Sequence, residues 1–266
     1  TEALDPIAPQ YRGDLVSWTA IGARTAESQT HRNLASGLST AVGFKNGTDG
    51  GLDGAVNAML SALKPHAFLG VSDQGRSAVI RTRGNPHGHL VLRGGARPNF
   101  DSVSVSLAEQ ALARAGLPQR IVIDCSHANS WRRPEMQPFV LRDALNQLRR
   151  GNRSILGVML ESFIEPGSQP VPEDRSKLRY GCSVTDPCLG WDDTVAALRE
   201  ARDHIAALRE EVELRPRLGE LAQVVLALGD PEARLERVRP LVLALEGAEA
   251  LEREAPPVLP LAGEAG

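Results

Sequence analysis

The feature that most constrains the fold is a short apolar run that ends in polar residues and recurs along the chain. Residues 121–129 (IVIDCSHAN) end in an acid, a thiol, a hydroxyl and an imidazole. Residues 154–162 (SILGVMLES) end beside Glu161, and residues 90–95 (LVLRGG) contain Arg93. Continuous apolar runs of this length are typical of strands buried on both faces. Because parallel strands bring their carboxyl ends to one rim, the pattern predicts an α/β fold with charged side chains gathered there.

Two further runs continue the pattern, since residues 18–23 (WTAIGA) precede Arg24 and residues 41–45 (AVGFK) end at Lys45. Apolar residues at helical spacing predict helices over 25–38, 52–63, 103–115 and 138–150, and from 192 into the 200s. Residues 66–72 and 76–82 flank a turn at Asp73, Gln74 and Gly75, which predicts a β-hairpin. Five strand–helix units are fewer than a closed (β/α)8 barrel contains. We therefore expect an α/β fold of the (β/α)8 TIM-barrel type, incomplete at its N-terminus and carrying an inserted β-hairpin.

The chain divides by composition near residue 209. We expect residues 1–209 to form the barrel portion and residues 210–266, rich in Leu, Ala, Arg and Glu, to form a helical extension. Its helices are predicted near 220–228 and 231–245, followed by a Pro/Gly/Ala tail that is expected to be disordered.

Charge and hydropathy exclude several classes of function. The net charge of −3 over 266 residues gives no reason to expect nucleic acid or an anionic membrane as a partner. No apolar run approaches the ~18 residues of a transmembrane helix, and residues 1–10 lack the pattern of a secretory signal, which favours the cytoplasm. Three cysteines without CxxC spacing argue against a disulfide framework.

Two groups of side chains point to chemistry at the rim. Arg24, Lys45 and Arg93 predict a pocket for a small polyanion such as a phosphorylated carboxylate, with glycines nearby that let backbone approach the ligand. An imidazole and two carboxylates suit a divalent ion such as Mn²⁺, Fe²⁺, Co²⁺ or Zn²⁺; these are His127, Glu161 and Asp186. Acid–base work without metal is the alternative, and any one of these residues alone is more often a surface or core residue.

Six segments carry a family resemblance: residues 20–32 (AIGARTAESQTHR), 42–50 (VGFKNGTDG), 84–95 (GNPHGH with LRGG), 123–130 (IDCSHANS), 157–162 (GVMLES) and 180–194 (YGCSVTDPCLGWDDT). Together they resemble the type I 3-deoxy-D-arabino-heptulosonate 7-phosphate (DAHP) synthases over about residues 2–208. The resemblance implies a metal-dependent (β/α)8 barrel that condenses phosphoenolpyruvate with erythrose 4-phosphate, the first step of the shikimate pathway.

The resemblance also implies roles for individual residues. Lys45 and Glu2 would be catalytic, Asp186 would face the aldehyde substrate, and His127, Glu161 and Asp186 would hold the metal. Phosphoenolpyruvate would be bound by Gly22, Ala23, Arg24, Lys45 and Arg93. An aromatic amino acid effector, with tyrosine favoured, would lie near Pro9, Gln10, Leu38, Ser39 and Phe68. A homodimer or homotetramer is the implied assembly.

One departure from the family pattern bears on activity. The family's first barrel strands carry a fourth metal ligand, a cysteine, and a KPRTT-like segment, and nothing in this sequence corresponds to them. Cys125, Cys182 and Cys188 all lie downstream of that position. We therefore expect the chain by itself to be unstable or inactive unless a partner supplies the missing strands. An inactive fragment or regulatory remnant, and a related aldolase with another acceptor, are the alternative interpretations.

Overall fold

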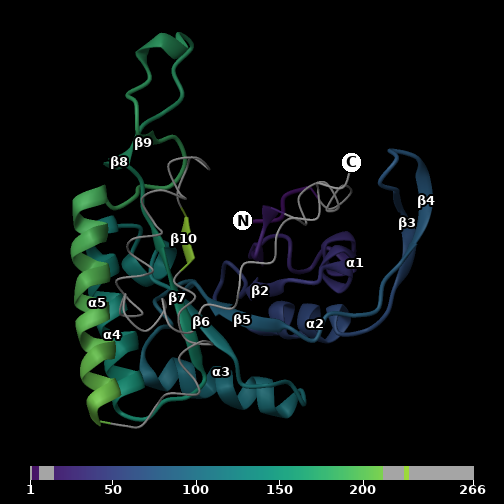
Figure 1. Ribbon diagram of the computed structural model, residues 1–266, viewed down its shortest axis with the longest axis horizontal. Helices are drawn as coiled ribbons and strands as arrows, with labels where there is room; N and C mark the ends of the chain where they lie inside the picture. Colours follow the sequence, from purple (N-terminus) through teal and green to yellow (C-terminus); the bar gives the residue numbers. More distant parts are fainter. Residues whose placement is uncertain (1, 6–14, 212–224, 228–266) are drawn as a thin grey trace, which may run out of the picture.

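The computed structural model describes residues 2–5, 15–211 and 225–227, and its centre is a six-stranded parallel sheet. The strand order is β1-β2-β5-β6-β7-β10, and every neighbouring pair is parallel. The strands are β1 (Trp18–Ile21), β2 (Ala41–Lys45), β5 (Gly88–Leu92), β6 (Ile121–Asp124), β7 (Ile155–Glu161) and β10 (Val225–Ala227). The sheet curls into a half-barrel, which confirms the predicted α/β class (Figure 1).

The connections between the long strands are helical. The helices are α1 (Gln29–Gly37), α2 (Asp53–Ala62), α3 (Ser102–Arg114), α4 (Gln137–Arg149) and α5 (Trp191–Glu211). Local sequence explains where two of them begin or end. The Asp101 carboxylate accepts hydrogen bonds from the backbone N–H groups of Val103 and Ser104 at the start of α3. Gly151 follows α4 with φ +102°, a conformation that favours glycine. None of the helices in the described residues is both long and apolar enough to cross a membrane.

Two small ribbons accompany the sheet. β3 (Ala67–Val71) and β4 (Ser77–Arg81) form the predicted antiparallel hairpin, which projects from the body of the molecule beside α2 (Figure 1). Gly75 adopts φ +73° in its turn, and its N–H donates to the Ser72 carbonyl at 2.8 Å. β8 (Glu165–Ser168) and β9 (Cys182–Ser183) pair in a stretch for which the sequence predicts neither strand nor helix. This ribbon was not predicted, because its strands are short and the residues between them are rich in turn formers.

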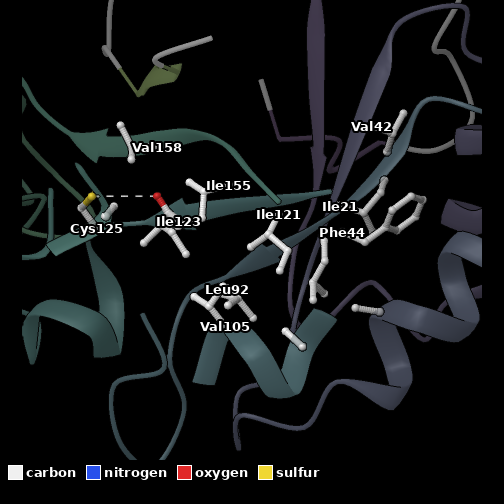
Figure 2. Packing of buried hydrophobic residues seen from close by; sticks show 14 of the residues in the cluster. Ile21, Val42, Phe44, Leu92, Val105, Ile121, Ile123, Cys125, Ile155 and Val158 are labelled. Atoms are coloured by element: carbon white, nitrogen blue, oxygen red, sulfur yellow. Dashed lines mark hydrogen bonds between the residues drawn. The ribbon is translucent and has the colours of Figure 1, made fainter. Parts of the chain in front are cut away.

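Because side chains alternate between the two sides of each strand, the sheet has two apolar faces. One face packs against the helices and buries a large cluster that includes Ile21, Val42, Phe44, Leu92, Ile121 and Ile123 (Figure 2). Cys125 belongs to it, with its thiol 3.9 Å from the Ile123 carbonyl oxygen. The opposite, inner face carries a smaller cluster of Trp18, Ala20, Val91, Val122 and Met159. Since side chains alternate along a strand, Lys45, Asp124 and Glu161 also belong to the inner face, each at the carboxyl end of its strand.

The C-terminal extension differs from expectation where it is described. A helix was predicted near residues 220–228, but Val225–Ala227 is a strand that pairs with β7, Val225 opposite Met159 and Ala227 opposite Glu161. Without this strand, the edge of β7 would have unpaired backbone N–H and C=O groups. A short Leu/Val-rich stretch can form hydrogen bonds with them in place of the hydrogen bonds within a helix. The helix expected over 231–245 and the tail lie outside the described residues, and the division at residue 209 remains a prediction.

Candidate metal and anion site

Lys45 and Asp124 form the buried centre of the candidate site. They are the last residues of β2 and β6, and the Lys45 Nζ lies 3.4 Å from Asp124 Oδ2. Glu2 approaches from the chain start, with its Oε2 3.7 Å from the same Nζ. An isolated bridge to Ala20 of β1 holds that segment in place. A Cβ on Gly22 would lie 2.3 Å from Glu2 Oε1, so the glycine leaves room for the carboxylate.

His127 stands between Asp124 and two further carboxylates. It opens a short 3₁₀ helix, η3 (His127–Ser130), and its Nδ1 lies 2.9 Å from Asp124 Oδ2 and 2.8 Å from Ser126 Oγ. Its Nε2 lies 3.5 Å from Glu161 Oε1 and 3.7 Å from Asp186 Oδ2. The imidazole and the two carboxylates that the sequence predicts at this rim lie together in the structure.

The spacing of these three donors fits a divalent metal. One donor atom from each of His127, Glu161 and Asp186 lies within 4.8 Å of the others. Two ligand atoms held tetrahedrally about 2.1 Å from one ion are about 3.4 Å apart, which is near the two distances measured from His127 Nε2. An imidazole with two carboxylates is a donor set that Mn²⁺, Fe²⁺, Co²⁺ and Zn²⁺ accept.

The charges of this cluster are strongly coupled. Burial, together with the negative charges of Asp124 and Asp186, raises the pKa of Glu161 to about 7 against the opposing pull of His127. Burial acts to raise the pKa of Asp124 as well, but Lys45 and His127 outweigh it and hold that pKa well below its usual range. Burial acts to lower the pKa of Lys45, yet Asp124 and Glu2 raise it on balance. The ammonium is therefore charged, and the carboxylates around His127 favour an added cation.

The two arginines of the predicted anion pocket lie in different settings. Arg93 is 7% exposed after β5, and burial lowers its pKa although Asp124 and Asp186 act in the opposite direction. Arg24 is exposed after β1. Ala23, which precedes it, is half-buried, and Gly22 is buried. The structure thus gathers Lys45 and Arg93 toward the acids, while Arg24 remains at the periphery.

Three asparagines connect the loops that carry these residues. The Asn46 Oδ1 accepts hydrogen bonds from the backbone N–H of Arg93 at 2.8 Å and from Asn99 Nδ2 at 3.2 Å. The Asn46 Nδ2 donates to the Gly94 carbonyl at 2.9 Å. The Asn99 N–H donates to Asn129 Oδ1 at 2.8 Å. Asn129 in turn donates to the carbonyl of Asp124 at 2.8 Å. This asparagine chain joins the carboxyl ends of β2, β5 and β6.

A cavity of about 600 Å³ opens beside the cluster. Its lining includes Glu2, Lys45, Asp124, Glu161 and Asp186, and it extends to residues 178–185 around β9. Arg24, Arg93 and His127 do not line it. The cavity is large enough for a small phosphorylated substrate.

The predicted effector residues lie elsewhere, near the base of the hairpin. Half-buried Leu38 and exposed Ser39 follow α1, and half-buried Phe68 lies on β3. The Ser36 and Thr82 hydroxyls, 2.8 Å apart, join the end of α1 to the hairpin base. Pro9 and Gln10 lie outside the described residues.

Asp124, Ser126 and the asparagines are site residues that were not predicted from the sequence. A signal for Asp124 was present, because it ends its strand on the same face as Lys45 and Glu161. The asparagines gave no such signal, since their importance depends on hydrogen bonds between residues as far apart as Asn46 and Asn99.

A curled parallel sheet whose strand ends gather charged side chains at one rim is the architecture of the α/β-barrel class of proteins. Residues 1–199 match the model of the DAHP synthetase I family, and the chain belongs to that family.

Individual relatives agree with this membership. The chain is 54% identical over 200 residues to the Tyr-sensitive phospho-2-dehydro-3-deoxyheptonate aldolase of Salmonella typhimurium, covering 75% of this chain and 56% of that relative. It is 49% identical over 208 residues to the Phe-sensitive enzyme of Escherichia coli K12, covering 78% and 59%. A solved phospho-2-dehydro-3-deoxyheptonate aldolase from Francisella tularensis superposes with a TM-score of 0.70 at 45% identity, covering 74% of this chain and 57% of that one. The chain thus spans little more than half the length of these relatives.

Proposed function

We propose that this chain forms the phosphoenolpyruvate- and metal-binding part of a DAHP synthase, which condenses phosphoenolpyruvate with erythrose 4-phosphate. The observation that carries the proposal is the continuous cluster from Lys45 through Asp124 and His127 to Glu161 and Asp186. The half-barrel would then be part of a complete (β/α)8 barrel, as its coverage of just over half of each relative supports.

The cations of the rim would hold the anionic substrate. Lys45 stays protonated beside Asp124 and Glu2, so its ammonium can donate hydrogen bonds to the carboxylate or phosphate of phosphoenolpyruvate. Buried Arg93 would add a planar pair of donors, and Arg24 with the backbone of Gly22 and Ala23 would complete the pocket. By neutralising the substrate these groups would hold its enol carbon in position for attack on the aldehyde carbon.

The metal-side residues would organise the second substrate. His127, Glu161 and Asp186 would hold a divalent ion, with Mn²⁺, Fe²⁺, Co²⁺ and Zn²⁺ as candidates. When bound, such an ion supplies a Lewis acid that polarises the erythrose 4-phosphate aldehyde. The Asp186 side chain is 48% exposed, which leaves it free to face the aldehyde substrate as well. Glu2 would remain beside Lys45 as the acid nearest the bound phosphoenolpyruvate.

Regulation by an aromatic amino acid is part of the proposal. Two relatives are named for sensitivity to tyrosine and to phenylalanine, and the higher identity is to the Tyr-sensitive one. Leu38, Ser39 and Phe68, with Pro9 and Gln10, are the residues we assign to such an effector. The homodimer or homotetramer implied by the family resemblance remains a prediction.

Binding of phosphoenolpyruvate in the presence of Mn²⁺, measured by titration calorimetry, tests the proposal. We expect the Lys45→Ala variant to bind phosphoenolpyruvate at least about tenfold more weakly, because it removes a charged hydrogen-bond donor from a buried site. Lys64→Ala is the matched control, since Lys64 is exposed after α2 and does not line the cavity. Equal affinities for Lys45→Ala and the unmodified chain would overturn the assignment.

A further inference from the structure

We propose that Asp124 and Ser126 are positioning residues that fix the tautomer of His127, so that Nδ1 carries the proton and Nε2 presents a free lone pair to a divalent cation. This inference rests on the metal site of the proposed function and adds the residues that orient its imidazole ligand. Ser126 Oγ lies between the other two groups, 2.6 Å from Asp124 Oδ1 and 2.8 Å from His127 Nδ1.

The protons and lone pairs available to each group determine which group donates in each hydrogen bond. A serine hydroxyl has one proton to donate, and a carboxylate can only accept. The Ser126 proton is therefore directed to Asp124 Oδ1, which also accepts the Ser126 backbone N–H at 2.9 Å. The Ser126 oxygen then has only lone pairs left for His127. Consequently, Nδ1 must be the donor in the 2.8 Å contact.

The second carboxylate oxygen strengthens the same assignment. Asp124 Oδ2 lies 2.9 Å from His127 Nδ1, so a proton on that nitrogen faces negative charge, whereas a lone pair there would be repelled. Asp124 is 1% exposed and Ser126 is 2% exposed, so these contacts lie almost entirely out of solvent. Lys45 supplies a countercharge to the same carboxylate oxygen, with its Nζ 3.4 Å from Asp124 Oδ2.

The opposite edge of the ring is arranged for a ligand. Nε2 is 3.5 Å from Glu161 Oε1 and 3.7 Å from Asp186 Oδ2, longer than a charged hydrogen bond. A metal-bound imidazole commonly donates its other N–H to a carboxylate or hydroxyl that sets its orientation. Asp124 and Ser126 therefore act through His127 and do not themselves touch the ion.

The tautomer can be measured directly on the metal-free chain. Nitrogen-15 chemical shifts of the His127 ring, recorded at alkaline pH where the imidazole is neutral, report which nitrogen carries the proton. We expect the Nδ1–H form in the unmodified chain. In Asp124→Asn the side-chain amide can donate to the ring, so the population should shift toward Nε2–H. Ser126→Ala, the milder change, should shift it less, because Asp124 Oδ2 remains beside Nδ1.

Mn²⁺ titration provides the second measurement. Loss of an orienting partner of this kind typically weakens metal binding about 10- to 100-fold, so we expect a loss in that range for Asp124→Asn and a smaller one for Ser126→Ala. Asp101→Asn is the matched control. Asp101 accepts a hydrogen bond from a serine hydroxyl, that of Ser104, at the same 2.6 Å, but it does so at the start of α3. The Asp101→Asn variant should change neither the tautomer of His127 nor the affinity for Mn²⁺.

The outcomes separate this inference from the proposed function. An unchanged His127 tautomer in both Asp124→Asn and Ser126→Ala overturns the inference, whether or not Mn²⁺ binds. Shifted tautomers with undiminished Mn²⁺ affinity also overturn it, because orientation would then not matter to the metal. If the unmodified chain shows the Nδ1–H form and the variants lose it, but no Mn²⁺ binds, the tautomer assignment stands and the metal part of the proposed function fails.

Discussion

His89 illustrates at the scale of one residue how burial sets a protonation state. It lies on the inner face of β5, is 4% exposed, and its Nε2 accepts a hydrogen bond from Trp18 Nε1 at 2.9 Å. Gly43 of β2 lies close to both rings, and a Cβ there would approach Trp18 to 2.5 Å and His89 to 3.0 Å. Burial, only partly opposed by a hydrogen bond to the His87 carbonyl, lowers the pKa of His89 to about 4.

This pKa predicts how stability depends on pH. Since the folded pKa of His89 is about 4 and the unfolded value is 6.5, the unfolded chain binds more protons between these two pH values. The contribution of neutral His89 is fully present above pH 6.5 and is lost as pH falls toward 4, by roughly 3 kcal/mol. Urea denaturation at pH 7 and pH 4.5 should show a smaller difference in His89→Gln than in the unmodified chain. His204→Gln on α5 is the control. The explanation would be wrong if His89→Gln lost as much stability between pH 7 and pH 4.5 as the unmodified chain, or if His204→Gln lost less.

At the scale of elements, the loops after β2 and β5 are pressed together. A Cβ on Gly95 would lie 2.1 Å from the Gly50 nitrogen and 2.3 Å from the Asp49 carbonyl carbon. The Ala96 N–H also donates to the Asp49 carbonyl at 3.2 Å. The β2 loop follows Lys45 and the β5 loop follows Arg93, so this contact adds to the pairing of β2 with β5, in which Lys45 lies opposite Val91.

We therefore predict opposite effects for two glycine-to-alanine changes. Gly95→Ala should lower the free energy of unfolding by at least about 1–3 kcal/mol, because the new methyl group meets rigid backbone. Gly54→Ala, in the first turn of α2, meets only the flexible Glu27 side chain at 3.5 Å and should raise stability by about 0.4–1 kcal/mol, because alanine restricts the unfolded chain more than glycine does. Denaturant titration of both variants provides the measurement. A stable Gly95→Ala variant would show that the two loops can separate.

At the scale of the whole molecule, the apolar layer between sheet and helices is the largest source of stability in the described residues. Phe44 of β2 is fully buried in it, beside Ile21 and Val42 of the same sheet (Figure 2). Phe139 of α4 is 57% exposed, and the Arg142 guanidinium carbon lies over its ring, 5.1 Å from the ring centre. Phe44 and Phe139 thus place the same kind of side chain in the core and at the surface.

Truncating these two rings should have very different effects. Phe44→Ala should cost about 3–5 kcal/mol, a large fraction of the 5–15 kcal/mol typical of a domain, because it leaves a cavity at the centre of the layer. Phe139→Ala should cost less than about 1 kcal/mol, the value of an exposed cation–π contact. Thermal and urea unfolding would measure both. Similar losses for the two variants would mean that the helices do not pack on β2 as the structure has them.

The sequence made the sheet and much of its rim predictable for a local reason. Strands at Ile121–Asp124 and Ile155–Glu161 follow from continuous apolar runs, and the hairpin follows from the turn at Gly75. Lys45, His127 and Glu161 could be placed at one rim because parallel strands all end on the same side. The β8–β9 ribbon and β10 could not be predicted, since such short strands depend on the partners that they find in space.

By itself, then, the sequence determined which side chains reach the rim, because alternation and strand polarity are local properties of the backbone. Tertiary structure alone decided which of them meet. Asp124 lies between Lys45 and His127 only because β6 comes to lie near β2 across β5, and Arg24 stays exposed at the end of β1. Distances between residues far apart in the chain, and the burial that makes their charges interact strongly, arise only when the sheet has formed.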